Sequence, residues 1–110
     1  MGNSYVSSRD IIVRTQAWSD AVQFYESVLG WRVLRRDKTM VGFDTGSFHL
    51  YVEKGAAHGA VLEFLVPDVQ LAKAQLLAAG CVVLEEDAAV PRCYVRDPQG
   101  LVFNIGPTRA

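Results

Sequence analysis

The 110-residue sequence has only 2 cysteines, and this scarcity limits the redox and metal chemistry open to it. Cys81 and Cys93 lie in the apolar runs CVVL and CYV, with no second pair of cysteines nearby. Free cysteines of this kind are usually buried. We therefore expect two reduced, buried thiols rather than a disulfide or a zinc site.

An excess of charge of one sign is also missing. The 11 lysines and arginines nearly balance the 12 aspartates and glutamates, which gives a net charge of -1 with both signs interspersed. Nucleic acids and acidic membrane surfaces bind basic stripes or patches, and the sequence offers none. We expect neither a nucleic acid nor a membrane as a partner.

Long hydrophobic runs are absent from the sequence as well. A membrane-spanning helix needs about 18 consecutive apolar residues, and the N-terminal MGNSYVSSRD is polar, without the apolar core of a secretory signal. We therefore expect a cytoplasmic protein. Its length and its 50% hydrophobic content fit one globular domain with a single core.

The apolar pattern predicts strands and one helix in the first half of the chain. DIIVRT predicts a strand, and apolar residues at 21, 24, 25, 28 and 29 predict a helix with Ser19 as N-cap and Gly30 beyond its end. Further strands are predicted from the runs WRVLRR, MVGFD and SFHLYVE.

The second half of the chain repeats this order. AVLEFLV predicts a strand, and Asp68 is the predicted N-cap of a helix ended by Gly80, with one face formed by Val69, Ala72, Leu76 and Leu77. Strands follow at CVVLEE, RCYVRD and LVFNI. Aligning the glycines that end the helices gives a repeat of about 50 residues. We expect one domain, 1–110, made of two modules, 8–55 and 58–108.

The stretch DPQG fixes the register of the last two strands. A type I turn with proline second and glycine in a left-handed conformation forms a hairpin with a G1 bulge. In this register Tyr94 faces Asn104 and Val95 faces Phe103. An apolar face under the helices follows, formed by Cys93, Val95, Leu101, Phe103 and Ile105.

The same alternation predicts a second, polar sheet face. It carries Asp10, Arg14, His49, Tyr51, Glu63, Arg92, Tyr94 and Asn104. Such a face of an antiparallel sheet is by default solvated, and its acids and arginines can form ion pairs without doing chemistry. If the sheets curl, the face instead lines a small-ligand pocket. Trp18, expected in the loop before the first helix and outside its apolar stripe, is an aromatic candidate for that pocket.

The segments FYESVLGWRVL, LLAAGCVVL and VRDPQGLVFNI, in this order and over nearly the whole chain, resemble the vicinal oxygen chelate superfamily. That superfamily includes glyoxalase I, bleomycin-resistance proteins and extradiol dioxygenases. The resemblance implies an α+β fold of two βαβββ modules, whose mixed sheets form a U-shaped cup that is commonly completed in a homodimer.

The resemblance also implies where a metal would bind. Metal-dependent members carry His, Gln or Glu on the first and last strands of each module, and the matching positions here are Asp10, His49, Val61 and Asn104. Valine cannot coordinate a metal, and Asn104 replaces a carboxylate with a neutral amide. We therefore expect a degenerate site and no metal cofactor, with a divalent metal as the alternative if Glu63 replaces Val61 as ligand.

Two functions follow from the resemblance. The first is a protein of the glyoxalase/bleomycin-resistance type that binds a small molecule in the cup of a homodimer through Arg14, Trp18, His49, Tyr51, Glu63, Arg92, Tyr94 and Asn104. The second is an enzyme, a lyase, isomerase or dioxygenase-like oxidoreductase. It would be either metal-dependent or metal-free, with His49 or Glu63 as general base and Arg92 stabilising an anion.

Overall fold

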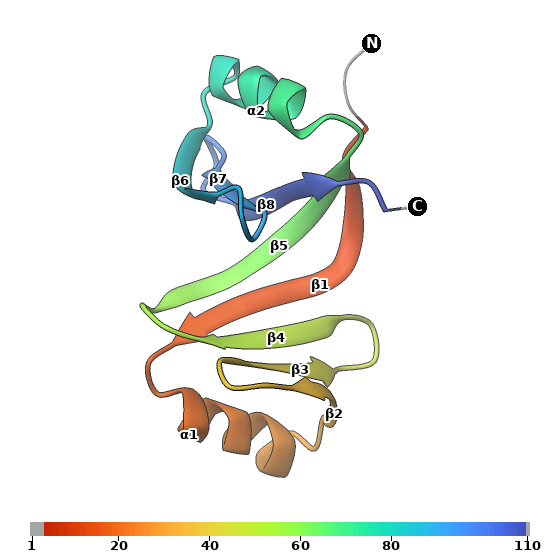
Figure 1. The fold of residues 1–110 in the computed structure, drawn as a ribbon, viewed down its shortest axis with the longest axis vertical. Helices are drawn as coiled ribbons and strands as arrows, with labels where there is room; N and C mark the ends of the chain where they lie inside the picture. The colour runs from red at the N-terminus through yellow and green to blue at the C-terminus, as the bar shows by residue number, and fades with distance from the viewer. Residues whose placement is uncertain (1–3, 110) are drawn as a thin grey trace. The chain divides into compact units, whose positions relative to one another are not determined.

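The computed structural model describes residues 4–109 and contains the predicted order of elements twice (Figure 1). The first copy consists of β1 (Val6–Thr15), α1 (Trp18–Gln23), the π-helical turn η1 (Phe24–Val28), β2 (Arg32–Arg36), β3 (Met40–Asp44) and β4 (His49–Lys54). The second consists of β5 (His58–Val66), α2 (Val69–Ala78), β6 (Val82–Asp87), β7 (Arg92–Arg96) and β8 (Val102–Pro107). This confirms the predicted α+β class with βαβββ modules. No helix within residues 4–109 has the length and apolar character needed to span a membrane.

The chain divides into two compact units. The first unit is Arg9–Val61, and the second unit is formed by the described residues on either side of that segment. In the first unit the strands lie in the order β2-β3-β4-β1, and in the second in the order β5-β8-β7-β6. Each sheet is mixed, because β1 pairs with β4 and β5 with β8 in parallel, while the remaining pairs are antiparallel.

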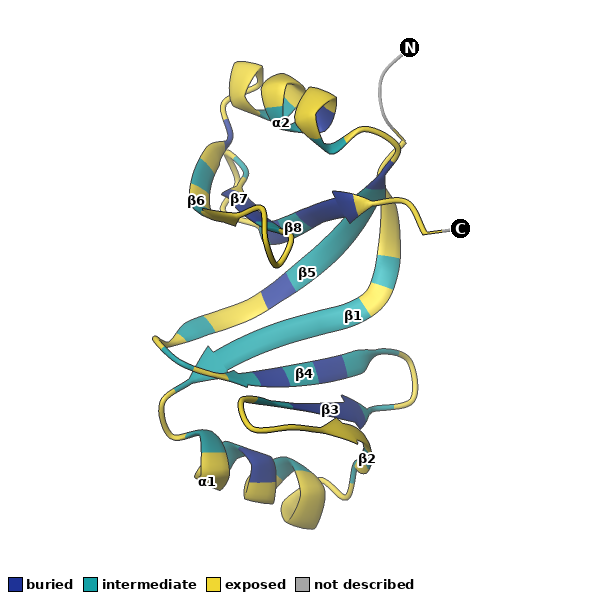
Figure 2. Cartoon of the chain, viewed as in Figure 1, coloured by how far each residue is buried: buried dark blue, intermediate teal, exposed yellow. Residues whose placement is uncertain are grey.

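The core of the first unit lies between its helix and the inner face of its sheet (Figure 2). Its buried residues are Val22, Val41, Phe43, Leu50 and Val52. Aromatic rings extend this core: Tyr25 stacks on Trp31 with ring centroids 5.4 Å apart, and Trp18 packs against the same cluster.

The first helix differs from its prediction at both ends. It begins at Trp18 after Ala17, with no side-chain cap, so the predicted N-cap at Ser19 is wrong. Its last turn widens, with the Leu29 amide donating to the Phe24 carbonyl five residues back. Because such a turn shifts the helical period, Phe24, Val28 and Leu29 of the predicted core stripe are exposed. Gly30 ends the helix as predicted, with φ of 70°.

The second unit follows its predicted pattern more closely. The Asp68 carboxylate caps α2 by accepting a hydrogen bond from the Leu71 amide at 3.0 Å. The buried core consists of Val66, Ala72, Cys93, Val95, Phe103 and Ile105. Leu77 and Leu101, which were predicted to face this core, are exposed. Both cysteines are free, buried thiols as expected, and burial raises the pKa of each above its ordinary value.

The hairpin between β7 and β8 has the predicted bulged register. Tyr94 pairs with Asn104, and Val95 with Phe103. The amide of Asp97 donates to the carbonyl of Leu101 at 2.9 Å, and Gly100 has φ of 98°. The turn chemistry therefore places Asn104 on the sheet face opposite α2.

Candidate functional site

A row of charged side chains crosses the sheet of the first unit on the face away from α1. His49 on β4 lies opposite Asp10 on β1 and opposite Asp44 on β3. Asp10 Oδ1 is 3.6 Å from His49 Nδ1, and about a third of each of these two side chains is exposed, 32% and 29%. His49 therefore lies between two carboxylates and remains accessible to a ligand.

Asp44 is held as a carboxylate by its surroundings. The backbone amide of Gly46 donates to its Oδ1 at 2.8 Å, and Arg32 pairs with its Oδ2 at 2.9 Å. The Gly46 hydrogen bond, followed by the charges of Arg32 and His49, lowers the pKa of Asp44 below its ordinary value.

Two further predicted site residues occupy the next rows of this face. Arg14 Nε lies 2.8 Å from Glu53 Oε1, and little of either side chain is exposed. Tyr51 lies directly over Gly42 of the neighbouring strand, where a Cβ atom would come within 2.6 Å of the ring. Glu53 was not predicted as a site residue, although it follows Tyr51 by two residues and therefore shares its face.

Asn104 lies at the centre of a hydrogen-bonded row on the polar face of the second unit. Its Oδ1 accepts a hydrogen bond from the Cys93 backbone amide at 2.7 Å. Its Nδ2 donates to Glu63 Oε2 at 3.3 Å, and Arg109 binds the other oxygen of Glu63 at 2.7 Å. A backbone N–H can only donate, so the amide oxygen has to face Cys93 and the amino group has to face Glu63.

Arg92 and Tyr94 form a second contact on this face. The guanidinium carbon of Arg92 lies 5.1 Å from the centre of the Tyr94 ring, within the range of a cation–π contact. Arg92 Nη1 also binds Glu85 at 2.8 Å. Tyr94 itself is only 5% exposed, so it offers little ring surface to a ligand. Glu85 and Arg109 were not predicted as partners. Alternation could not reveal them, because β6 has an irregular register at Glu85 and Arg109 follows β8.

The internal repeat identifies equivalent positions in the two units. β1 ends at Thr15 and β5 at Val66, and in both units the helix begins at the third residue after that end. Counting back, Asp10 corresponds to Val61, as the resemblance implied. Tyr51, which pairs with Ile12, then corresponds to Asn104, which pairs with Glu63. The repeat therefore makes Tyr51, rather than His49, the counterpart of Asn104.

The donor atoms do not fit the metal centre that the resemblance implies. Val61 has no donor atom, and the Asn104 oxygen is already used by a backbone N–H. Among residues 4–109, no group of three or more His, Cys, Asp and Glu side chains is placed to hold a metal ion. A divalent cation needs three or four good ligands in such a site, and these positions supply fewer.

Trp18 is the one predicted site residue on the other side of its sheet. It begins α1, packs against the core of the first unit, and donates its indole N–H to the Val52 carbonyl at 2.8 Å. The prediction that it lies in a loop, outside the apolar stripe, is wrong, because the helix begins earlier than expected. The polar face of the first unit thus carries Asp10, Arg14, His49 and Tyr51, and that of the second carries Glu63, Arg92, Tyr94 and Asn104.

Comparison with known proteins places this geometry in context. A family model described as a glyoxalase-like domain matches residues 10–106. No curated protein sequence matches the chain. A glyoxalase/bleomycin resistance protein/dioxygenase superfamily member from Vibrio splendidus 12B01 is similar in fold, with a TM-score of 0.63 and 14% identity over 94% of this chain and 97% of that one.

Homoprotocatechuate 2,3-dioxygenase from Brevibacterium fuscum is also similar in fold. Its anaerobic substrate complex, with 3,4-dihydroxyphenylacetate, gives a TM-score of 0.70 at 20% identity and covers 99% of this chain and 38% of the dioxygenase chain. A variant of the same enzyme in complex with HPCA gives 0.67 at 22% identity, with 99% and 34% covered. The chain therefore spans about a third of the length of these dioxygenase chains. At these identities the likeness shows the fold alone.

Proposed function

The chain belongs to the glyoxalase-like domain family, and on this premise we propose that it binds a small molecule on its polar sheet faces without holding a catalytic metal. The observation that carries this proposal is the hydrogen bonding of Asn104. Its oxygen accepts from the Cys93 backbone amide, and only its amino group is directed at another side chain, that of Glu63. At the position where the resemblance implies a metal-binding carboxylate, the Asn104 side chain thus binds neighbouring groups of the sheet instead.

The accessible polar groups indicate the chemistry of the ligand. In the first unit His49 and Asp10 are about one third exposed and offer a hydrogen-bond donor and an acceptor. Tyr51 adds an aromatic ring two residues along the same strand. Such a surface favours a small, partly aromatic molecule with polar substituents, held by stacking and by hydrogen bonds.

Two measurements on untagged protein test this proposal. Native mass spectrometry with metal analysis is expected to find no stoichiometric divalent ion. A thermal-shift screen of small aromatic compounds is expected to yield binders that raise the unfolding midpoint by mass action. For each binder, His49→Ala is expected to weaken binding, whereas Arg36→Ala, which removes an exposed arginine of β2 that pairs with Glu26, is the matched control. A bound divalent ion that His49→Ala removes would contradict the proposal.

A second candidate function is metal-free catalysis with His49 as general base. The specific observation is the Asp10 carboxylate 3.6 Å from His49 Nδ1, which can orient the imidazole while its other nitrogen meets a substrate. A turnover assay on each identified binder distinguishes the two functions. Consumption of the compound that is abolished by His49→Gln favours the enzyme, and recovery of the compound unchanged favours the binding protein.

We also propose that the protein works as a cytoplasmic homodimer. Apolar side chains exposed on its helices and edge strands support association, among them Phe24, Val28, Val82 and Leu84. Light scattering at micromolar concentration measures the mass in solution. A monomer under those conditions would contradict the proposed dimer. It would not affect the proposed ligand binding, which the thermal-shift screen tests.

A further inference from the structure

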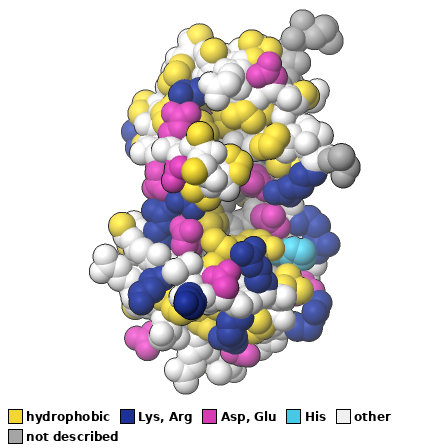
Figure 3. All heavy atoms as spheres, in the orientation of Figure 1, with side chains coloured by type: hydrophobic (Ala, Val, Ile, Leu, Met, Phe, Trp, Pro, Cys, Tyr) yellow, Lys and Arg dark blue, Asp and Glu magenta, His cyan; other side chains and the backbone are white. Residues whose placement is uncertain are grey.

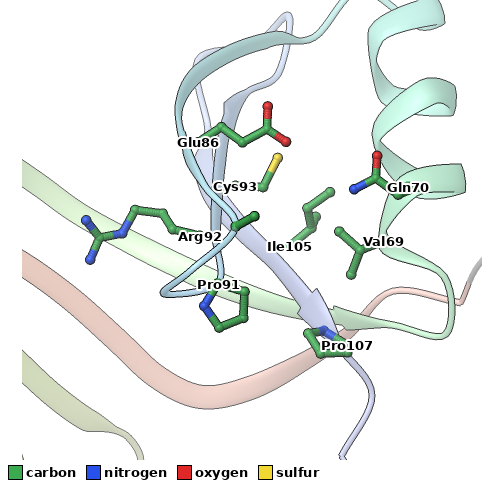
Figure 4. A pocket seen from close by; sticks show the side chains of 9 residues that line it. Val69, Gln70, Glu86, Pro91, Arg92, Cys93, Ile105 and Pro107 are labelled. Carbon is green, nitrogen blue, oxygen red and sulfur yellow. The ribbon is translucent and has the colours of Figure 1, made fainter.

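A pocket of about 230 Å³ opens in the second unit, on the side of the sheet that α2 covers. It lies between the start of α2 and the turn that joins β6 to β7 (Figure 4). Val69 and Gln70 line it from α2, Ala88 and Pro91 from the turn, and Cys93 and Ile105 from the sheet. These sheet residues belong to the apolar face, so the pocket is separate from the polar face that carries Glu63 and Asn104.

The internal repeat shows what fills the equivalent space in the first unit. Val69 is the first residue of α2, as Trp18 is of α1. Ile105 pairs with Phe64 as Val52 pairs with Val13, so Ile105 is the counterpart of Val52. In the first unit the Trp18 indole packs over the sheet there and donates its N–H to the Val52 carbonyl at 2.8 Å.

In the second unit the smaller Val69 side chain leaves this space open. The bottom of the pocket is formed by two buried residues, Cys93 at 4% and Ile105 at 2% exposure. Protein cores are packed to high density. The side chains that line a space of this size lack van der Waals contacts that a flat ring would supply. For comparison, a cavity of about 150 Å³ lined by apolar residues binds benzene.

The polar groups around the pocket include hydrogen-bond acceptors. Glu86 contributes a carboxylate whose oxygens are held by Lys73 at 2.7 and 3.0 Å, so its charge is already balanced. Gln70 contributes an amide group, whose oxygen can accept a hydrogen bond and whose nitrogen can donate one. Burial raises the pKa of the Cys93 thiol, which keeps that wall of the pocket uncharged. In Figure 4 the guanidinium group of Arg92 points away from the other lining side chains, so its positive charge lies outside the pocket.

We propose that this pocket binds a small, flat, uncharged aromatic molecule that carries one N–H or O–H donor, of the size and shape of indole. The molecule takes the place that the Trp18 side chain occupies in the first unit. Its ring packs on Cys93, Ile105 and Val69, and its donor binds an acceptor in the lining of the pocket. This inference goes beyond the proposed function, since it concerns the opposite face of the sheet.

A titration with indole, followed by methyl NMR of the full chain, tests the site. Shifts are expected at the methyl groups of Val69 and Ile105, while the methyl groups of Val22 and Val41 in the core of the first unit stay unchanged. 1-Methylindole, which lacks the N–H, is expected to bind about tenfold more weakly. Shifts spread over both units, or none at saturating indole, would overturn the proposal. Equal affinity for the two compounds would overturn the assignment of a donor.

Two matched variants of α2 test the pocket directly. Val69→Trp supplies the missing indole from the chain itself and is expected to weaken indole binding by about tenfold or more. Leu77→Trp adds the same side chain at an exposed position of the same helix and is expected to leave the affinity unchanged. If Val69→Trp does not fold, Cys93→Leu fills the pocket from the sheet side and is expected to weaken binding too. Undiminished binding in a folded filling variant would place indole elsewhere and refute the site.

Discussion

The hydrogen bonds of Asn104 give the most direct test of how the polar face of the second unit is built. Asn104→Leu keeps the size of the side chain but removes the acceptor 2.7 Å from the Cys93 amide and the donor 3.3 Å from Glu63. A buried N–H left without a partner costs about 1–3 kcal/mol. We therefore expect the free energy of unfolding to fall by about 2 kcal/mol, which lowers the thermal midpoint by roughly 8 °C in a domain of this size.

Urea unfolding at pH 7, with Asn104→Asp as the matched variant, measures this effect. The aspartate keeps an oxygen for the Cys93 amide but sets a second carboxylate against Glu63. We expect it to be destabilised at pH 7 and to approach the wild type below about pH 4, where carboxyl groups take up protons. The stability of Asn104→Leu relative to the wild type is expected not to recover at acid pH, because leucine has no group that takes up a proton. A leucine variant as stable as the wild type would refute the structural role assigned to Asn104.

Other perturbations address single contacts of the fold. Asp68→Ala removes the N-cap of α2 and is expected to cost about 1 kcal/mol in chemical denaturation, whereas Asp68→Ser retains a cap. The pKa of Asp44 is lowered chiefly by the Gly46 amide. The ionised Asp44 side chain therefore stabilises the fold above the unfolded-state pKa, and this stabilisation is lost as the pH falls through the folded-state pKa. We expect Asp44→Asn to reduce the loss of stability at acid pH in a stability–pH profile. Gly55→Ala places a Cβ atom 2.9 Å from Arg14 Cδ at a φ of 156°. We expect this to cost about 1 kcal/mol or more, which calorimetry would detect as a thermal midpoint lower by a few degrees. An unchanged midpoint would contradict the close packing of Gly55 against Arg14.

The surface of the molecule agrees with the sequence composition. On the face shown in Figure 3, basic and acidic side chains are interspersed. Among the described residues, oppositely charged side chains form close pairs, such as Arg92 with Glu85 and Lys73 with Glu86. These pairs were not predicted, because cross-strand and helix-to-strand neighbours depend on the register of β6, which shifts between Val83 and Glu85.

The elements that the sequence predicted well are those fixed by local chemistry. The DPQG turn determines its own bulge, and through it the facing of Tyr94 and Asn104. Asp68 caps the helix that follows it, since an aspartate side chain reaches the amides of the first turn. The first helix was predicted less well, because its π-helical turn shifts the apolar period beyond Phe24 and turns Val28 outward.

The sequence by itself determined the order of strands and helices, the repeat, and which residues alternate onto the polar face, because these depend on periods of two and 3.6 residues and on turn chemistry. Only the tertiary structure decided what those residues do. It gave the Asn104 oxygen to a backbone amide and set Asp10 beside His49. It also packed the Trp18 ring against the core of one unit and left a pocket over Val69 in the other. Such partners come from residues far apart along the chain, which meet only when the strands pair and the helices pack.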